Sequence, residues 1–68
     1  MNVVVNGETR LLDEGATLAD VLRDIGVAVD SRGVAVARNG TVVTRSEWST
    51  LSLDSGDQLE VLHAVQGG

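Results

Sequence analysis

The apolar positions of this chain fall in short runs separated by turn signals, a pattern typical of strands. Two Asn-Gly dipeptides, the strongest short-range hairpin signal, each stand between two such runs. The sequence therefore predicts two β-hairpins with two-residue turns. The first joins residues 2–5 to 9–12 through Asn6-Gly7, and the second joins 34–38 to 41–44 through Asn39-Gly40. Three successive valines at 3–5 do not alternate with polar residues, so they leave open which face of the first hairpin is buried.

One segment has the periodicity of a helix instead. Its apolar residues recur at i, i+3, i+4 and i+7, and they are Leu18, Val21, Leu22 and Ile25. Thr17 precedes them as an N-cap, and Asp20 can reach back to it as in a capping box, although Glu or Gln is the usual partner. Gly26 follows as the expected C-terminal stop. Because only one side of this helix is apolar, we expect it to lie across one face of the sheet.

The rest of the chain predicts loops and one more strand. Residues 27–33 indicate a loop, 45–49 a short helical turn, and 54–57 a polar turn. The last strand spans 58–64 and has apolar residues on both faces, which is typical of a central strand. The predicted fold class is α+β, with a sheet of four to five strands and one main helix packed across one face.

The composition fits a single small domain. A chain of 68 residues is too short for two cores, and Trp48 is its only aromatic residue, so Val, Leu and Ala must fill the interior. There is no cysteine, which excludes thiol chemistry and a Cys-based zinc site and suits a reducing cytoplasm. There is also no lysine, so no lysine side chain can act as a nucleophile. The net charge of −5 disfavours nucleic acid as a partner.

No targeting or membrane segment is visible in the sequence. The N-terminus lacks a basic stretch followed by a long apolar run, and no stretch approaches the roughly 18 apolar residues of a membrane span. We therefore expect a cytoplasmic protein without a membrane partner.

The side chains offer little for catalysis. His63 shares strand parity with Leu59 and Val61, which favours a structural role at the strand end. The acidic pairs Asp13/Glu14 and Asp54/Asp57 stand beside glycines, where turns explain them better than acid–base chemistry does. No glycine-rich phosphate loop with a lysine is present, and no residues are assigned to a metal site. We therefore expect that the chain is not an enzyme.

Trp48 allows two interpretations. It can fill the core, or it can lie at the rim and anchor a partner. The shortage of other bulky side chains favours the core. Arg45 just before it can pair with acidic groups of this chain or with a partner.

The remaining candidate is the Gly67-Gly68 pair that closes the sequence. Chance, a frayed end or an expression scar can produce such a pair, since termini tolerate almost any residue. As a functional feature, residues 65–68 form a slim flexible tail after a domain spanning 1–64, and from Ala64 the tail can reach about 15–18 Å. A carboxylate on residues without Cβ atoms can enter a narrow channel. Adenylation there makes it reactive toward a sulfur or nitrogen nucleophile.

The chain resembles a known family, the small ubiquitin-like β-grasp sulfur carrier proteins of thiamine biosynthesis (ThiS). The resemblance covers nearly the whole length, and the Arg45-x-x-Trp48 element together with the closing Val65-Gln66-Gly67-Gly68 is its most specific part. Its other matching segments are residues 5–8, 17–22, 36–40 and 54–57. Two positions depart from the family pattern: Thr44 replaces the usual Pro before the Arg, and Arg38 replaces a small apolar residue, a change that we interpret as surface variation.

The resemblance implies a defined chemistry. Gly68 would carry the sulfur as a thiocarboxylate, and Gln66, Gly67 and Gly68 would enter the active site of a partner. The implied partners are a ubiquitin-activating-enzyme-like (ThiF-like) adenylyltransferase that uses ATP and Mg, a sulfur donor enzyme and a ThiG-like thiazole synthase, and the chain itself would bind no cofactor. The small subunit of molybdopterin synthase, a ubiquitin-like protein modifier and a plain interaction domain remain as alternatives. No surface residue can be assigned to docking from the sequence.

Overall fold

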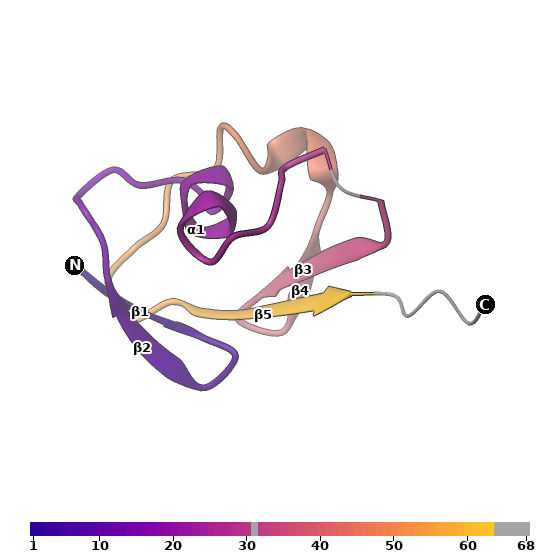
Figure 1. Ribbon diagram of the computed structural model, residues 1–68. Coiled ribbons are helices and arrows are strands. Elements are labelled where there is room, and N and C mark those ends of the chain that lie inside the picture. The colour runs from indigo at the N-terminus through magenta and orange to yellow at the C-terminus, as the bar shows by residue number, and fades with distance from the viewer. Residues whose placement is uncertain (31, 64–68) are drawn as a thin grey trace.

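A mixed β-sheet forms the base of the molecule and carries a single helix on one face (Figure 1). The computed structural model describes residues 1–30 and 32–63. Within them the sheet has five strands in the order β2-β1-β5-β3-β4. The elements, in chain order, are β1 (Asn2–Val5), β2 (Glu8–Leu11), α1 (Leu18–Asp24), β3 (Val34–Arg38), β4 (Thr41–Val43), the 3-10 turn η1 (Arg45–Glu47) and β5 (Gln58–His63). This is the α+β architecture that the sequence predicts.

Both predicted hairpins are present. β1 pairs antiparallel with β2, and β3 with β4. Asn6 and Asn39 have φ near +50°, and Gly7 and Gly40 follow with φ of +82° and +85°. Positive φ at both central residues is the signature of a type I′ turn, whose twist matches that of the flanking strands. The strands β2 and β4 end one residue earlier than predicted, at Leu11 and Val43.

The helix begins and ends at the signals in the sequence. Thr17 caps it, with the Thr17 N–H donating to the Asp20 carboxylate at 2.9 Å and the Asp20 N–H donating to the Thr17 hydroxyl at 3.3 Å. At the other end the Gly26 N–H bonds to the Arg23 carbonyl, and the Val27 N–H bonds to the Leu22 carbonyl. These two bonds form a Schellman motif, which requires the positive φ of +84° found at Gly26. The capping box and the glycine stop are therefore confirmed.

The core lies between α1 and one face of the sheet. The largest fully buried side chains come from the helix and from three strands, and they are Leu18, Leu22, Leu59, Val3, Val21 and Val36. Val3 and Val5 point into this core, whereas Val4 is only half-buried. The packing thus settles which face of the first hairpin is buried, a point that the run of valines left open.

β5 is the central strand of the sheet. It pairs in parallel with β1 and antiparallel with β3. The sequence predicted the central position, but the reason it gave was wrong. That reason was that apolar residues on both faces of the strand are buried. Leu62 on the second face is 60% exposed, so this face is not covered. The predicted end of the strand at Ala64 lies outside the described residues.

Candidate functional site

The predicted sulfur-carrying tail lies outside the part of the chain that the structure describes. This applies to Gln66, Gly67 and Gly68, and also to the predicted boundary between domain and tail at residues 64 and 65. The structure describes the strand that leads to them. His63 ends β5 directly opposite Val34 of β3, so the described chain ends at a paired residue.

His63 is exposed at the end of β5. Among residues 1–30 and 32–63, no group of three or more His, Asp or Glu side chains could hold a metal ion. The structural role of His63 expected from the sequence stays a prediction.

An apolar patch lies beside the strand that carries the tail. On the face of the sheet away from α1, Ala35 pairs with Leu62, and Ala37 pairs with Val42. Directly paired residues point to the same side of a sheet, so Ala35 and Ala37 of β3 lie between Leu62 on β5 and Val42 on β4, with Glu60 beside Ala37 on the same face; we call the four apolar residues the open-face patch. Val42 is 72% and Leu62 is 60% exposed. An exposed apolar group of this kind is typical of a protein-binding surface. The apolar residues on the second face of β5 were the sequence signal for this patch. The sequence did not show that β3 pairs with β5, so the four residues could not be assigned to one surface.

Trp48 belongs to the core. Its side chain is buried at 3% exposure, and its indole Nε1–H donates to the Val43 carbonyl at 3.2 Å. The Arg45 guanidinium lies over the ring, 4.5 Å from the centroid, and Arg45 Nη1 also donates to the Val29 carbonyl at 2.6 Å. A cation above an aromatic face contributes about 0.5–1 kcal/mol at an exposed site. The core interpretation is confirmed, and Arg45 interacts within its own chain.

Trp48→Phe is expected to lower the free energy of unfolding by about 1–2 kcal/mol. The change removes the indole N–H, leaves the Val43 carbonyl without this donor, and reduces the volume of a packed side chain. Urea denaturation followed by circular dichroism measures the loss. A variant as stable as the wild type would contradict the assigned hydrogen bond and packing.

Arg38 corrects one sequence interpretation, because it is not surface variation. Arg38 Nε donates to the Asp57 carboxylate at 2.9 Å, and Arg38 Nη2 lies 2.8 Å from Asp57 and 3.1 Å from Asp54. Asp57 is buried at 6% exposure and accepts two further hydrogen bonds, from Asn39 Nδ2 and from the Asp54 N–H. The sequence missed this network because its bonded residues are 16 to 19 positions apart along the chain, except in the local Asp54–Asp57 bond.

The same network explains Asp54 and Asp57 as turn residues. Burial of the Asp57 carboxyl opposes its ionisation, but the hydrogen bonds from the Asp54 N–H, Asn39 and Arg38 outweigh burial and hold the pKa of Asp57 below its usual value of 3.8. The cluster lies where β5 begins, at the opposite end of that strand from the tail. It therefore stabilises the fold and is not an acid–base pair.

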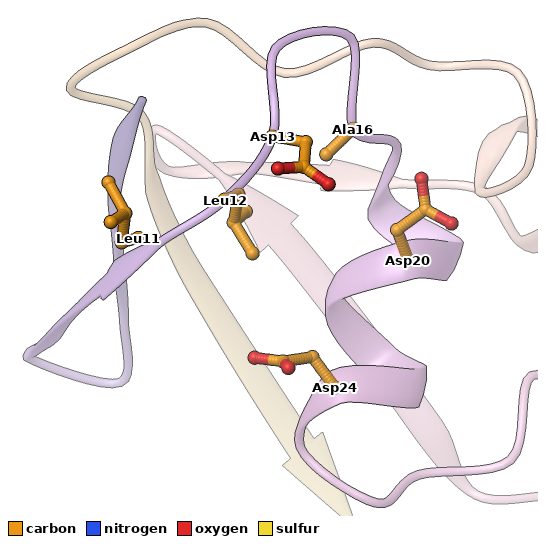
Figure 2. Close-up of a pocket in the computed structure, with 6 residues that line it drawn as sticks. All are labelled: Leu11, Leu12, Asp13, Ala16, Asp20 and Asp24. Atoms are coloured by element: carbon orange, nitrogen blue, oxygen red, sulfur yellow. The ribbon is translucent and has the colours of Figure 1, made fainter.

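A shallow hollow of about 370 Å³ lies between the chain after β2 and α1 (Figure 2). Its lining residues are Leu11, Leu12, Asp13, Ala16, Asp20 and Asp24. Asp20 caps the helix and pairs with Arg23, while Asp24 pairs with Arg10 at 3.0 Å. The hydrogen bond from the Thr17 N–H, together with that from Arg23, lowers the pKa of Asp20 despite some desolvation. The carboxylates of Asp20 and Asp24 are therefore engaged in local structure.

Across the described residues, no helix is both long and apolar enough to cross a membrane.

Comparison with known proteins identifies the family. The family model described as the ThiS family matches residues 3–68. The sulfur carrier protein ThiS of Thermus thermophilus is 42% identical over 66 residues, which cover 97% of this chain and 98% of that protein. The thiazole synthases of Paramagnetospirillum magneticum and Magnetococcus marinus are each 38% identical over 68 residues, and the chain spans about a fifth (20%) of their length.

A solved structure agrees with the sequence comparisons. The crystal structure of the thiamine biosynthesis protein ThiS from Geobacter metallireducens superposes with a TM-score of 0.76 at 32% identity, over 100% of both chains. The β-grasp fold expected from the resemblance is thereby confirmed. On the family match and the full-length similarity, the chain belongs to the ThiS family.

Proposed function

We propose that this chain is a sulfur carrier protein of thiamine biosynthesis and that the carboxylate of Gly68 carries the sulfur. The observation that supports this most is its similarity, over nearly the full length of both, to a protein named as a sulfur carrier. The family match also extends through residue 68. A carrier role also fits the carboxylates of Asp20, Asp24 and Asp57, which serve a helix cap and ion pairs.

The proposed chemistry takes place at the tail. One carboxylate oxygen of Gly68 attacks the α-phosphorus of ATP, and pyrophosphate leaves, which gives an acyl-adenylate. A persulfide sulfur then attacks the acyl carbon, and AMP leaves with the shared oxygen. Reductive cleavage of the sulfur–sulfur bond by a thiol leaves the thiocarboxylate. ATP, Mg and the catalytic groups belong to the adenylating partner, while Gly67 and Gly68 contribute an unhindered carboxylate on a slim backbone.

A thiazole synthase is the proposed acceptor of the sulfur. Two relatives that bear this name contain a stretch similar to all 68 residues within a chain about five times as long. A carrier module within the same chain as the acceptor enzyme supports a direct encounter between the two activities. The cytoplasmic location expected from the sequence is part of this proposal, as are the adenylyltransferase and the sulfur donor enzyme.

We propose that the open-face patch contacts the adenylating partner. Five residues follow His63, and a fully extended chain of that length reaches about 15–18 Å. An enzyme whose active site holds Gly68 would then lie within about 15–18 Å of the end of β5, where Leu62 is exposed. An apolar surface at this point would bury against the partner while the tail enters its channel.

Leu62→Ser and Val42→Ser are each expected to weaken binding to the adenylating partner about tenfold, since loss of a central apolar contact costs more than about 1 kcal/mol. Isothermal titration calorimetry with the purified partner measures the dissociation constant. Leu11→Ser is the matched control: Leu11 is 80% exposed on β2, at the far side of β1 from β5. Equal weakening by all three variants, or none by the first two, would contradict the docking role of the patch.

Intact-mass spectrometry tests the function directly. The full chain is incubated with the adenylating enzyme, Mg-ATP and a sulfur source, and the proposal predicts exchange of one terminal oxygen for sulfur. No exchange with a partner of demonstrated activity would overturn the proposal. The molybdopterin alternative predicts a molybdenum-cofactor requirement when the gene is lost, whereas a thiamine requirement supports the proposal made here.

A further inference from the structure

The side chain of Asn6 bonds to β5 close to the point where the tail begins. Its Oδ1 accepts a hydrogen bond from the Val61 N–H at 2.8 Å, and its Nδ2 donates to the Val61 carbonyl at 3.2 Å. These are the two backbone groups that a neighbouring strand would engage. From the sequence, Asn6 was predicted only as a turn residue, and its φ of +50° agrees with that prediction.

This contact continues the pairing of β1 with β5 after the main chain has turned away. β1 is in register with β5 at Val4↔Gln58 and Val5↔Leu59, and the Asn6 N–H then donates to the Leu59 carbonyl at 2.9 Å. The backbone next enters the type I′ turn toward β2, so no residue of β1 stands opposite Val61. The side-chain amide of Asn6 makes the hydrogen bonds to Val61 that a residue of β1 would otherwise make. Val61 is two residues from the end of the strand at His63.

On its other side, β5 has a strand partner along its last residues. β3 pairs with β5 as far as Val34↔His63. Without the Asn6 amide, the last three residues of β5 would be held by β3 alone. A strand end with only one neighbour opens locally at a lower free energy than one with two.

We propose that Asn6 is a positioning residue for the tail: its amide bonds to Val61 and keeps the end of β5, from which the tail continues, in place. The proposal rests on the sulfur-carrier function proposed above. The end of β5, which precedes the tail, is then already ordered when a partner binds the tail. When the strand end opens, the binding-competent state is less populated, and the apparent affinity falls by the same fraction.

Asn39 provides a matched control within the same chain. It occupies the same position of the same type of turn, with the same φ, and it is exposed like Asn6. Its side chain also makes two hydrogen bonds, accepting from the Gln58 N–H at 2.9 Å and donating to Asp57 at 3.1 Å. These bonds lie at the beginning of β5, so their loss weakens the fold without touching the tail end.

The experiment compares Asn6→Gly with Asn39→Gly, because glycine keeps the positive φ of each turn and removes only the amide. Amide hydrogen exchange by NMR is expected to be about fiftyfold faster at Val61 in Asn6→Gly only, because both side-chain hydrogen bonds to Val61 are lost. In the loading reaction, Asn6→Gly is expected to raise KM about fivefold with kcat within about twofold of wild type. Asn39→Gly is expected to lower the melting temperature at least as much and to leave KM unchanged. Asn6→Asp, which keeps the acceptor for the Val61 N–H, should give an intermediate KM.

Two outcomes overturn the positioning role alone: an unchanged KM in Asn6→Gly, or KM values that rise with the loss of melting temperature in both glycine variants. Failure of the wild-type chain to load would instead overturn the sulfur-carrier function, and this proposal with it. The exchange rate at Val61 is measured without any partner, so it reports on the Asn6 contact in either case.

Discussion

Deletion of Gly68 is expected to abolish thiocarboxylate formation and to leave the domain folded. The deletion withdraws the carboxylate from the adenylating site by one residue, about 3.5 Å in an extended chain, and a misplacement of even 1 Å can cost about a hundredfold in rate. Among the described residues, 1–30 and 32–63, the buried core comes from positions between Val3 and Val61, so we expect stability not to change. Intact-mass spectrometry measures loading, and thermal denaturation followed by circular dichroism measures the fold.

Gly68→Ala is the control for this deletion. It keeps a carboxylate at the same distance along the chain and adds one methyl group beside it. We expect slower loading rather than none, because the methyl group narrows the clearance in the partner's channel but leaves the reacting carboxyl in place. If the shortened chain were loaded at the wild-type rate, Gly68 would not be the sulfur-carrying residue.

The elements whose signals are local in sequence were predicted correctly. The two Asn-Gly turns, the Thr17–Asp20 capping box and the Gly26 stop each depend on residues within a few positions of one another. Each of these signals acts on the backbone through contacts between residues close in sequence. They were sufficient to predict both hairpins and the helix.

The features that the sequence missed all depend on long-range pairing. Arg38 is 19 positions from Asp57, and Asn6 is 55 positions from Val61, so neither partner can be chosen without the sheet topology. The exposure of Leu62 was missed for the same reason, since apolar residues on both faces of a strand do not reveal which face the single helix covers. The site residues Gln66, Gly67 and Gly68 were predicted from the tail and the resemblance, and they stay predictions.

Asp57→Ala is expected to have the largest effect on stability, lowering the free energy of unfolding by about 3 kcal/mol. Removing one partner of a buried ion pair leaves the other charge uncompensated and costs about 3–5 kcal/mol. The lower end applies here because the Arg38 side chain is still 21% exposed. A domain of this size has only about 3–5 kcal/mol in total, so the variant should retain about 2 kcal/mol or less. Urea denaturation followed by the fluorescence of the buried Trp48 measures the change.

Asp54→Ala is the matched control, because Asp54 also pairs with Arg38 but its side chain is 84% exposed. An exposed ion pair contributes less than about 1 kcal/mol, so this variant should be close to wild type. Equal losses in the two variants would show that burial of Asp57 is not what makes the network stabilising.

The pH dependence of stability provides an independent measure of the same network. The pKa of Asp57 in the folded protein lies below its value of 3.8 in the unfolded chain. The carboxylate therefore contributes its full stabilisation above pH 3.8, and the contribution is lost as the pH falls from there through the lower folded pKa. Asp57→Asn removes this titration, so between pH 7 and pH 3 its stability should fall less than that of the wild type. The pKa of Asp20 is also lowered, so protonation of Asp20 at low pH destabilises the wild type and the variant alike. Urea denaturation of the two proteins across this range makes the comparison, and parallel curves would exclude Asp57 as a source of acid sensitivity.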